Sequence, residues 1–423
     1  MSVHFRFGWV DAGPSPDKLA QSTMATLSVE AGGATVTSVL DRANRIYSDE
    51  VVVPLFSIAE WLVANWWHIW YEVGDANEQR PAFESRHNLA FAGDGFVLPS
   101  LNMIPASGRV HLQWKRYKPR HARIEFVDEG RQSVERDELE SELRNLIDGV
   151  IERLHGRPET GAAADSLGRA WNAVNDLDAD ELEFSRAAAL LGIDPFDVRD
   201  SVADAIVAFW ERADPAIRED ALAIASENSL TRVGTWLDEA IETLAKNQND
   251  SDWADIRSGL PPLATAEPWA RGYALARAAR ERIGASGGPA DFAQHGPMAI
   301  PHHDTQPPTW RIHGLVGTDT PACMTAPRGK AGKRFLIARA LGDYLGRSAP
   351  GLGMLSSLAT DRQAQSRAFA AEFLVPAESL RRRLSSDSVD AERTDELAQE
   401  FCVSSELIRR QIQNHDLARV VGY

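Results

Sequence analysis

Hydrophobic and polar positions change their pattern along the chain. Up to about residue 130, short runs of β-branched and aromatic residues are separated by Gly, Pro, Asp or Asn, which is typical of strands. We expect one helix among them, over residues 57–72. The predicted strands cover residues 4–10, 24–29, 35–40, 50–55, 110–114 and 122–127.

The rest of the chain is mainly helical in pattern. Residues 136–283 carry Ala, Leu, Glu and Arg at helical spacing, and a loop rich in Gly, Pro and His follows. A strand over 309–316 then precedes further helices. These changes predict a multidomain α+β protein. Its expected parts are a β-rich domain over 1–132, an all-helical domain over 133–285, a loop over 286–308, and a C-terminal domain over 309–423 with helices and a small sheet.

The helix expected over 57–72 is rich in tryptophan. Trp66 and Trp70 share one face by their i, i+4 spacing, and His68 lies between them in sequence. A helix with so much apolar circumference is usually buried on several sides. Two interpretations stay open: a pocket for a ligand or partner lined by Trp66, Trp70 and His68, or a packed central helix.

Residues 334–345 have the frame of a zinc-peptidase helix without its metal ligands. In an H-E-x-x-H helix, the two histidines lie one turn apart and hold zinc, and the Glu activates the bound water. Here the three positions are Arg339, Ala340 and Asp343. We therefore expect the helix without the usual chemistry.

The segments that follow make this frame more specific. They include two triplets: Phe369, Ala370 and Ala371, and then Leu374, Val375 and Pro376. The stretch 397–404 follows and reads L-A-x-x-F-x-V-S. The succession resembles the C-terminal half of the ImmA/IrrE family of zinc metallopeptidases, in which a Glu on the second helix is the third zinc ligand. That position falls on Gln365.

The resemblance covers roughly residues 305–423 and implies a zincin-like domain that has lost its zinc. We expect no bound zinc and no catalytic residue at Arg339, Ala340, Asp343 or Gln365. Since Arg339 and Asp343 stand four residues apart, an ion pair between them is one way to fill the vacated cavity. A cleft open to water or to a ligand is the other.

A metal bound elsewhere is the alternative to a silent site. The predicted loop holds His302, His303 and Asp304, which with Asp343 or Asp361 could supply nitrogen and oxygen ligands. Adjacent residues in an extended chain point to opposite faces, which argues against His302 and His303 sharing one ion.

Two segments resemble helix-turn-helix units. The stretch 184–206 has Gly192 in its turn and an expected second helix from Asp194 onward, but that helix is acidic and unsuited to DNA phosphates. The C-terminal tail has Ser404 or Ser405 as a possible helix cap and carries Arg409 and Arg410, so DNA contact there stays an alternative.

Composition narrows the classes of partner. The 423 residues carry a formal net charge of −16, which argues against a general nucleic-acid-binding surface. The two cysteines do not form a disulfide framework, and we expect a cytoplasmic protein without a membrane span.

Taken with the resemblance, these features predict a catalytically silent regulatory module. We expect it to sense or bind a partner protein in a stress, toxin–antitoxin or phage-defence system. The alternatives are a hydrolase with a metal site near His302, Asp304 and Asp343, and a transcriptional regulator bound to DNA through the C-terminal tail.

Overall fold

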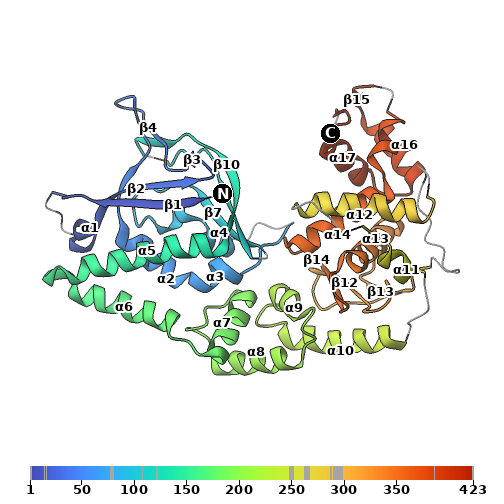
Figure 1. Ribbon diagram of the computed structural model, residues 1–423, viewed down its shortest axis with the longest axis horizontal. Coiled ribbons are helices and arrows are strands. Elements are labelled where there is room, and N and C mark those ends of the chain that lie inside the picture. Colours follow the sequence, from blue (N-terminus) through green and yellow to red (C-terminus); the bar gives the residue numbers. More distant parts are fainter. Residues whose placement is uncertain are drawn as a thin grey trace. The chain divides into compact units, whose positions relative to one another are not determined.

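The protein folds into compact units that combine helices with small sheets (Figure 1). The computed structural model describes residues 2–13, 15, 17–76, 81–106, 108–120, 122–246, 252–261, 267–285, 288, 299–384 and 386–421. The first unit is Met1–Ala203 and the second is Asp204–Tyr423. This mixture of elements is compatible with the predicted multidomain α+β fold.

The strands of the first unit form small antiparallel sheets. In the largest, β2 (Met24–Ala31) pairs with β1 (Val3–Trp9) along one edge, and with β3 (Ala34–Thr35) and β6 (Val51–Pro54) along the other. Alternate residues of β2 are buried, as in a sheet with one face on the core. A second sheet has the strand order β10 (Gly130–Glu135), β8 (Arg109–Trp114), β7 (Leu101–Ala106). A third sheet has the order β5 (Ile46–Ser48), β4 (Val39–Asp41), β9 (Ile124–Phe126).

Helices complete the core of the first unit. The long helix α5 (Arg136–His155) turns an apolar stripe inward and packs along β1, α2 (Leu55–Ala64) and α6 (Gly161–Asn175). The helices and short 3-10 turns are α1 (Lys18–Ser22), α2 (Leu55–Ala64), α3 (Trp66–Tyr71), α4 (Pro81–His87), η1 (Leu89–Ala92), α5 (Arg136–His155), η2 (Pro158–Thr160), α6 (Gly161–Asn175) and α7 (Ala179–Leu191).

The structure corrects several predicted elements in this unit. The helix predicted over 57–72 begins at Leu55 and is interrupted at Asn65, whose side-chain amide donates to the carbonyl of Trp61 at 2.8 Å. The strand predicted over 35–40 is the end of β3, a turn and the start of β4. β7, β10 and α4 are not in the prediction, because polar residues and a proline interrupt their patterns.

The second unit combines helices with one larger sheet and a short parallel pair. The strand order of the larger sheet is β11 (His302–Asp304), β13 (Cys323–Thr325), β12 (Ile312–Val316), β14 (Gly353–Ser356). In the short parallel pair, β15 (Ser388–Val389) lies beside β16 (Arg419–Val420). The helices are α9 (Arg218–Ile224), α10 (Leu230–Lys246), α11 (Trp253–Ser258), α12 (Pro268–Arg282), α13 (Lys330–Gly346), α14 (Asp361–Leu374), α15 (Ala377–Arg381), α16 (Ala391–Phe401) and α17 (Ser405–Asn414).

The division into units differs from the predicted domains. The boundary falls inside α8 (Asp200–Arg212), within the segment 133–285 that was expected to form a separate helical domain. α5 and α6 contribute to the core of the first unit, whereas α12 packs closely on α14 in the second. An amphipathic helix shows which face is buried but not which element covers it, so the sequence pattern does not decide how these helices are divided.

The segment predicted as a loop over 286–308 is extended at its described end. His302, His303 and Asp304 form β11, which pairs in parallel with β13. His295, which belongs to the same predicted loop, lies outside the described residues. No helix within the described ranges is long and apolar enough to cross a membrane.

Candidate functional site

α13 and α14 pack closely enough to bring their polar side chains together. A Cβ atom at Gly342 would lie 2.5 Å from the Phe369 ring, so only glycine permits this approach of α14 to α13. Arg339 and Asp343 lie one turn apart on α13 and are both buried. The side chains of α14 that contact them are Arg362, Gln363 and Ser366.

Arg339 is a buried cation held largely by neutral acceptors. Its guanidinium donates to Gln363 Oε1 at 2.6 Å, to the Ser356 carbonyl at 3.1 Å, and to His313 Nδ1 at 2.9 Å. Burial, followed by repulsion from Arg367, lowers the pKa of Arg339 to about 9. The acceptors fix the guanidinium in place and fill the space around it.

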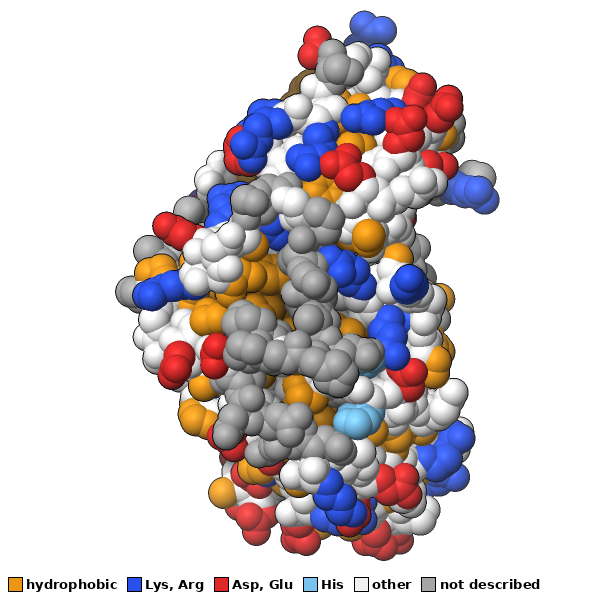
Figure 2. Space-filling model, turned by 90° about the vertical axis from the view of Figure 1, so that its right-hand side faces the viewer, with side chains coloured by type: hydrophobic (Ala, Val, Ile, Leu, Met, Phe, Trp, Pro, Cys, Tyr) orange, Lys and Arg blue, Asp and Glu red, His pale blue; other side chains and the backbone are white. Residues whose placement is uncertain are grey.

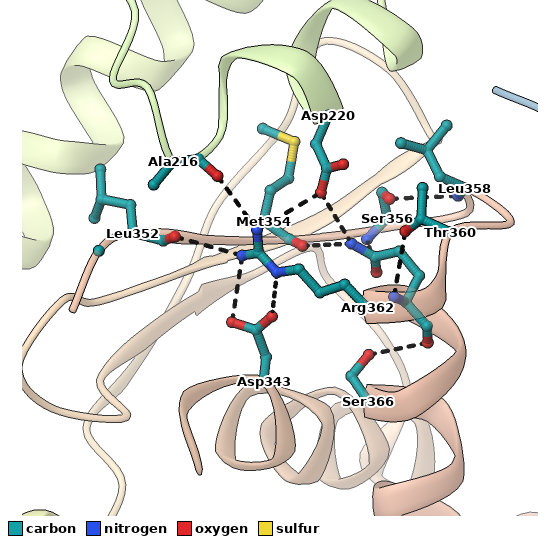
Figure 3. A network of polar contacts seen from close by, with 12 residues as sticks. Ala216, Asp220, Asp343, Leu352, Met354, Ser356, Leu358, Thr360, Arg362 and Ser366 are labelled. Carbon is teal, nitrogen blue, oxygen red and sulfur yellow. Dashed lines mark hydrogen bonds and ion pairs between the residues drawn. The ribbon is translucent and has the colours of Figure 1, made fainter. Parts of the chain in front are cut away.

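Asp343 forms ion pairs with two other arginines. Its carboxylate accepts from Arg362 Nε at 2.6 Å (Figure 3). It also accepts from Arg347 Nη2 at 2.5 Å. Burial alone would raise the pKa of Asp343, but Arg362 and Arg347 hold it below its usual range. The possible pair between Arg339 and Asp343 is therefore replaced by separate sets of partners.

The network continues from Arg362 and Gln363 to α9. Gln363 Nε2 donates to Asp220 Oδ2 at 3.3 Å, and Arg362 lies 4.0 Å from the same carboxylate (Figure 3). Burial, reduced by Arg362 and reinforced by nearby Asp343, raises the pKa of Asp220 to about 6. Of the carboxylates in this network, Asp220 is thus the one that titrates nearest neutral pH.

The remaining predicted positions lie apart from this network. Ala340 is fully buried in an apolar cluster. Gln365 accepts from Arg271 Nε of α12 at 3.1 Å. The predicted vacated positions are thus divided: Arg339 and Asp343 face the start of α14, whereas Gln365 contacts α12.

Sequence reasoning missed Arg347, Arg362, Gln363, Ser356 and Asp220. One signal was available, since Asp343 and Arg347 are an i, i+4 pair in the favourable order, with the acid first. Contacts with Arg362, Gln363 and Asp220 depend on tertiary packing, which no local spacing shows.

The alternative metal ligands are not gathered into a site. Asp304 pairs with Lys333 at 3.0 Å, and the Asp343 carboxylate is occupied by its arginines. Within the described ranges, no group of three or more His, Cys, Asp or Glu side chains is placed to hold a metal ion.

The tryptophan-rich segment lies in the core of the first unit. Trp66, Trp70 and His68 are buried, and the Trp66 ring packs edge-on against Trp171 with centroids 4.8 Å apart. The guanidinium of Arg144 lies over the Trp66 ring at 4.9 Å. This arrangement matches a packed central helix and offers no open tryptophan-lined pocket at these residues.

His68 belongs to a buried polar cluster around Glu72. Arg86 donates to both carboxylate oxygens of Glu72, and His68 and His87 lie 3.3 and 3.5 Å from one of them. Burial opposes ionisation of Glu72, but hydrogen bonds with His68, His87 and Arg86 lower its pKa. The cluster ties α3 to α4 within the core.

The C-terminal tail is joined to the domain core. Of the two serines predicted as possible caps, Ser404 caps α17 and accepts from the Leu407 amide. Arg409 and Arg410 both pair with Glu406, while Gln411 donates to the Val375 carbonyl at 2.7 Å. These contacts match a helical pair that closes the domain better than a recognition helix with arginines directed at DNA.

The other predicted helix-turn-helix unit has a different second helix. Gly192 ends α7 with a positive φ of 80°, as its place in the turn requires. α8 begins at Asp200 rather than near Asp194, because residues 195–197 form a turn.

The second unit also has an open groove between α13, the chain leading into β11, and the α16–α17 turn. Its volume is about 940 Å³, and it is lined by apolar residues that include Ile300, Ile337 and Val403. Lys330 and Lys333 lie along the same groove. Figure 2 shows one face of the molecule, on which several Lys and Arg side chains lie near hydrophobic surface.

Comparison with known proteins gives no assignment. No family model matches this chain, and no curated protein matches it.

Proposed function

We propose that this chain is a catalytically silent, zincin-like regulator of the ImmA/IrrE type that acts by binding a partner protein. The observation that supports this most is the network around Arg339 and Asp343. At the positions where an H-E-x-x-H helix would hold zinc, it has a guanidinium and a carboxylate that are already bonded to other groups.

This network is unsuited to hydrolytic chemistry. A catalytic zinc needs neutral imidazoles, thiolates or free carboxylates as ligands, and an open coordination position for water. Arg339 repels a cation, and Asp343 can bind one only after losing Arg347 and Arg362, which would leave those cations without their shared carboxylate.

The groove between α13 and α16–α17 supports partner binding. It joins apolar lining to the lysines at the start of α13, in a chain whose net charge is −16. A segment with apolar and acidic side chains is complementary to that surface. By analogy with the family, the partner belongs to a stress, toxin–antitoxin or phage-defence system.

Charge reversal in the groove tests partner binding. Proteins captured from the source cell are compared between the parent chain and the double variant Lys330→Glu, Lys333→Glu, with Lys18→Glu on α1 of the first unit as the matched control. We expect a specific partner to be lost only from the groove variant. A partner that binds all three chains equally would contradict a role for the groove.

A further inference from the structure

An open cavity of about 460 Å³ lies at the end of α13 in the second unit. Its walls also come from α11, α12 and the connection between β12 and β13. One part of the lining is apolar and includes Leu260, Leu275 and Leu345. Among the described residues, the charged side chains of the lining are those of Arg257, Asp319 and Arg347. A cavity of this size is typical of sites for small molecules.

The Arg347 side chain is engaged within the protein. Its Nε and Nη2 donate to Asp343 Oδ2 at 3.0 and 2.5 Å. Its Nη1 donates to the carbonyls of Gly317 and Gly351. Arg347 therefore fixes a wall of the cavity, and the charged groups left for a ligand are those of Arg257 and Asp319.

Arg257 is held in place by one side of its guanidinium. The guanidinium lies 5.0 Å from the centre of the Tyr344 ring, and its Nη2 donates to the Arg347 carbonyl at 2.9 Å. Trp253, on the same helix, is 1% exposed and anchors α11. Within the described ranges, no carboxylate pairs with Arg257, and its Nε and Nη1 donate to no other group. A guanidinium with free N–H groups is well suited to bind a carboxylate.

Asp319 places the opposite charge on the same cavity. Its side chain is exposed, and in the part of the chain that the structure describes its carboxylate forms no ion pair or hydrogen bond. The backbone there is fixed, because the Tyr344 hydroxyl donates to the Asp319 carbonyl at 2.8 Å. Tyr344 thus has Arg257 over its ring and Asp319 at its hydroxyl end. The two opposite charges line one cavity without pairing with each other.

We propose that this cavity binds a small zwitterion of the amino-acid type, with a free carboxylate, a free ammonium group and an apolar side chain. The carboxylate binds Arg257, and the ammonium group binds Asp319. The end of α13 lines the cavity at Leu345 and Gly346, and the C-terminus of a helix also favours positive charge. The apolar side chain packs on the leucines of the lining.

A ligand with a single charge fits this cavity less well. An anion at Arg257 leaves the Asp319 carboxylate beside it without compensation, and a cation at Asp319 leaves Arg257 in the same position. The cavity lies at the end of α13, whereas the groove proposed for a partner protein lies at its start, around Lys330. Binding of a zwitterion therefore does not depend on the proposed function.

Calorimetric titration of the full chain with free leucine, isoleucine, valine, methionine and phenylalanine tests the proposal. We expect at least one of these amino acids to bind, with one molecule per chain. Its N-acetyl derivative lacks the ammonium charge and its amide lacks the carboxylate, so each should bind about tenfold more weakly or worse. No binding of any of the five at millimolar concentration would overturn the proposal, as would equal affinity for the free and the capped forms.

Matched variants locate the bound amino acid. Asp319→Asn and Arg257→Gln should each weaken its binding by about tenfold or more. Asp255→Asn, at an exposed position of α11 outside the lining, should leave the affinity within about twofold of the parent chain. Against the amide, which has no carboxylate, Arg257→Gln should have little further effect.

The test stays valid if Arg257→Gln fails to fold. Asp319→Asn changes an exposed side chain that has no bonded neighbour among the described residues, so it should keep the stability of the parent chain. Binding that is unchanged in Asp319→Asn and in Arg257→Gln would place the amino acid elsewhere and contradict this site.

Discussion

Arg339 shows how a buried cation can be accommodated by neutral groups. Its contacts with Gln363, Ser356 and His313 supply directed acceptors, while its burial lowers its pKa. Such a residue stabilises the fold through its directed hydrogen bonds more than through its charge, because the desolvation of the guanidinium offsets much of the electrostatic gain.

Removing the Arg339 side chain should destabilise the second unit. We expect Arg339→Ala to cost about 3–4 kcal/mol, because it leaves a cavity and buried acceptors without donors. Arg339→Met should cost less, since it fills more of the space and Gln363 Oε1 keeps its bond from the Ser356 amide. Urea unfolding of both variants measures the difference; equal losses would contradict a role for packing at this position.

Asp220 should make stability depend on pH between its unfolded and folded pKa values. Because burial raises its pKa from 3.8 to about 6, the folded state disfavours the charged form. The contribution of Asp220 to stability is then most favourable below the unfolded pKa and declines as pH rises toward 6. The decline should be about 3 kcal/mol.

Comparison with Asp220→Asn isolates this contribution from other carboxylates. The unfolding free energy of the parent chain relative to this variant should fall between about pH 4 and 6 and then stay level. Asp238→Asn, at an exposed position, serves as the control. A difference that is constant over this pH range would show that Asp220 has an ordinary pKa in the fold.

At the scale of elements, helix pairs carry much of the packing in both units. α3 is short for a stable isolated helix, so its position depends on the rings of Trp66 and Trp70 and on their contacts with α5 and α6. α13 and α14 similarly depend on the close approach at Gly342.

Trp66→Ala should destabilise the first unit by about 3–5 kcal/mol, as expected for a large aromatic side chain in a core. Trp310→Ala is a suitable control, because that side chain is 57% exposed. Thermal and urea unfolding measure both variants. A loss for Trp66→Ala as small as for the control would contradict the packed position of α3.

Introducing the metal ligands of the ImmA/IrrE family should fail at the level of helix packing. In the fourfold variant Arg339→His, Ala340→Glu, Asp343→His and Gln365→Glu, Arg347 and Arg362 lose their shared carboxylate. Position 365 also contacts α12. We expect a destabilised second unit without zinc uptake.

Unfolding and metal titration together examine this variant. Arg339→Met is the control for damage from a single change in the network. A fourfold variant that is stable and binds one zinc ion per chain would show that the four positions can form a metal site after all.

How much the sequence could predict depends on whether the signal is local. The Ser404 cap, the turn at Gly192 and the helical frame around Arg339 follow from neighbouring residues, and the structure contains them. Asp343 pairs with Arg347, which directly follows α13, and with Arg362 of α14. The pair with Arg362 requires tertiary packing. Local spacing therefore predicted the helix but not its network.

At the scale of the whole molecule, the sequence pattern shows where strands give way to helices, but not which of these elements share a core. The change from strands to helices near residue 136 is correct for α5, yet α5 belongs to the same core as β1. The helices of the predicted middle domain divide between units because their apolar faces fit different neighbours. A sequence periodicity cannot specify that choice.

The charge of the whole chain also bears on its partners. With a net charge of −16, long-range attraction favours basic partners, whereas the groove at Lys330 and Lys333 favours acidic segments locally. Binding at this groove should therefore respond to changes in its local charges more than to the net charge of the chain.

The central claim, that the second unit is a silent zincin-like domain, is tested most directly by its affinity for zinc. Purified protein is incubated with zinc, desalted and analysed for metal, and its melting temperature is measured with and without a chelator. We predict well below one zinc ion per chain and an unchanged melting temperature. One tightly bound zinc ion per chain, lost to the chelator together with stability or peptide hydrolysis, would contradict the account.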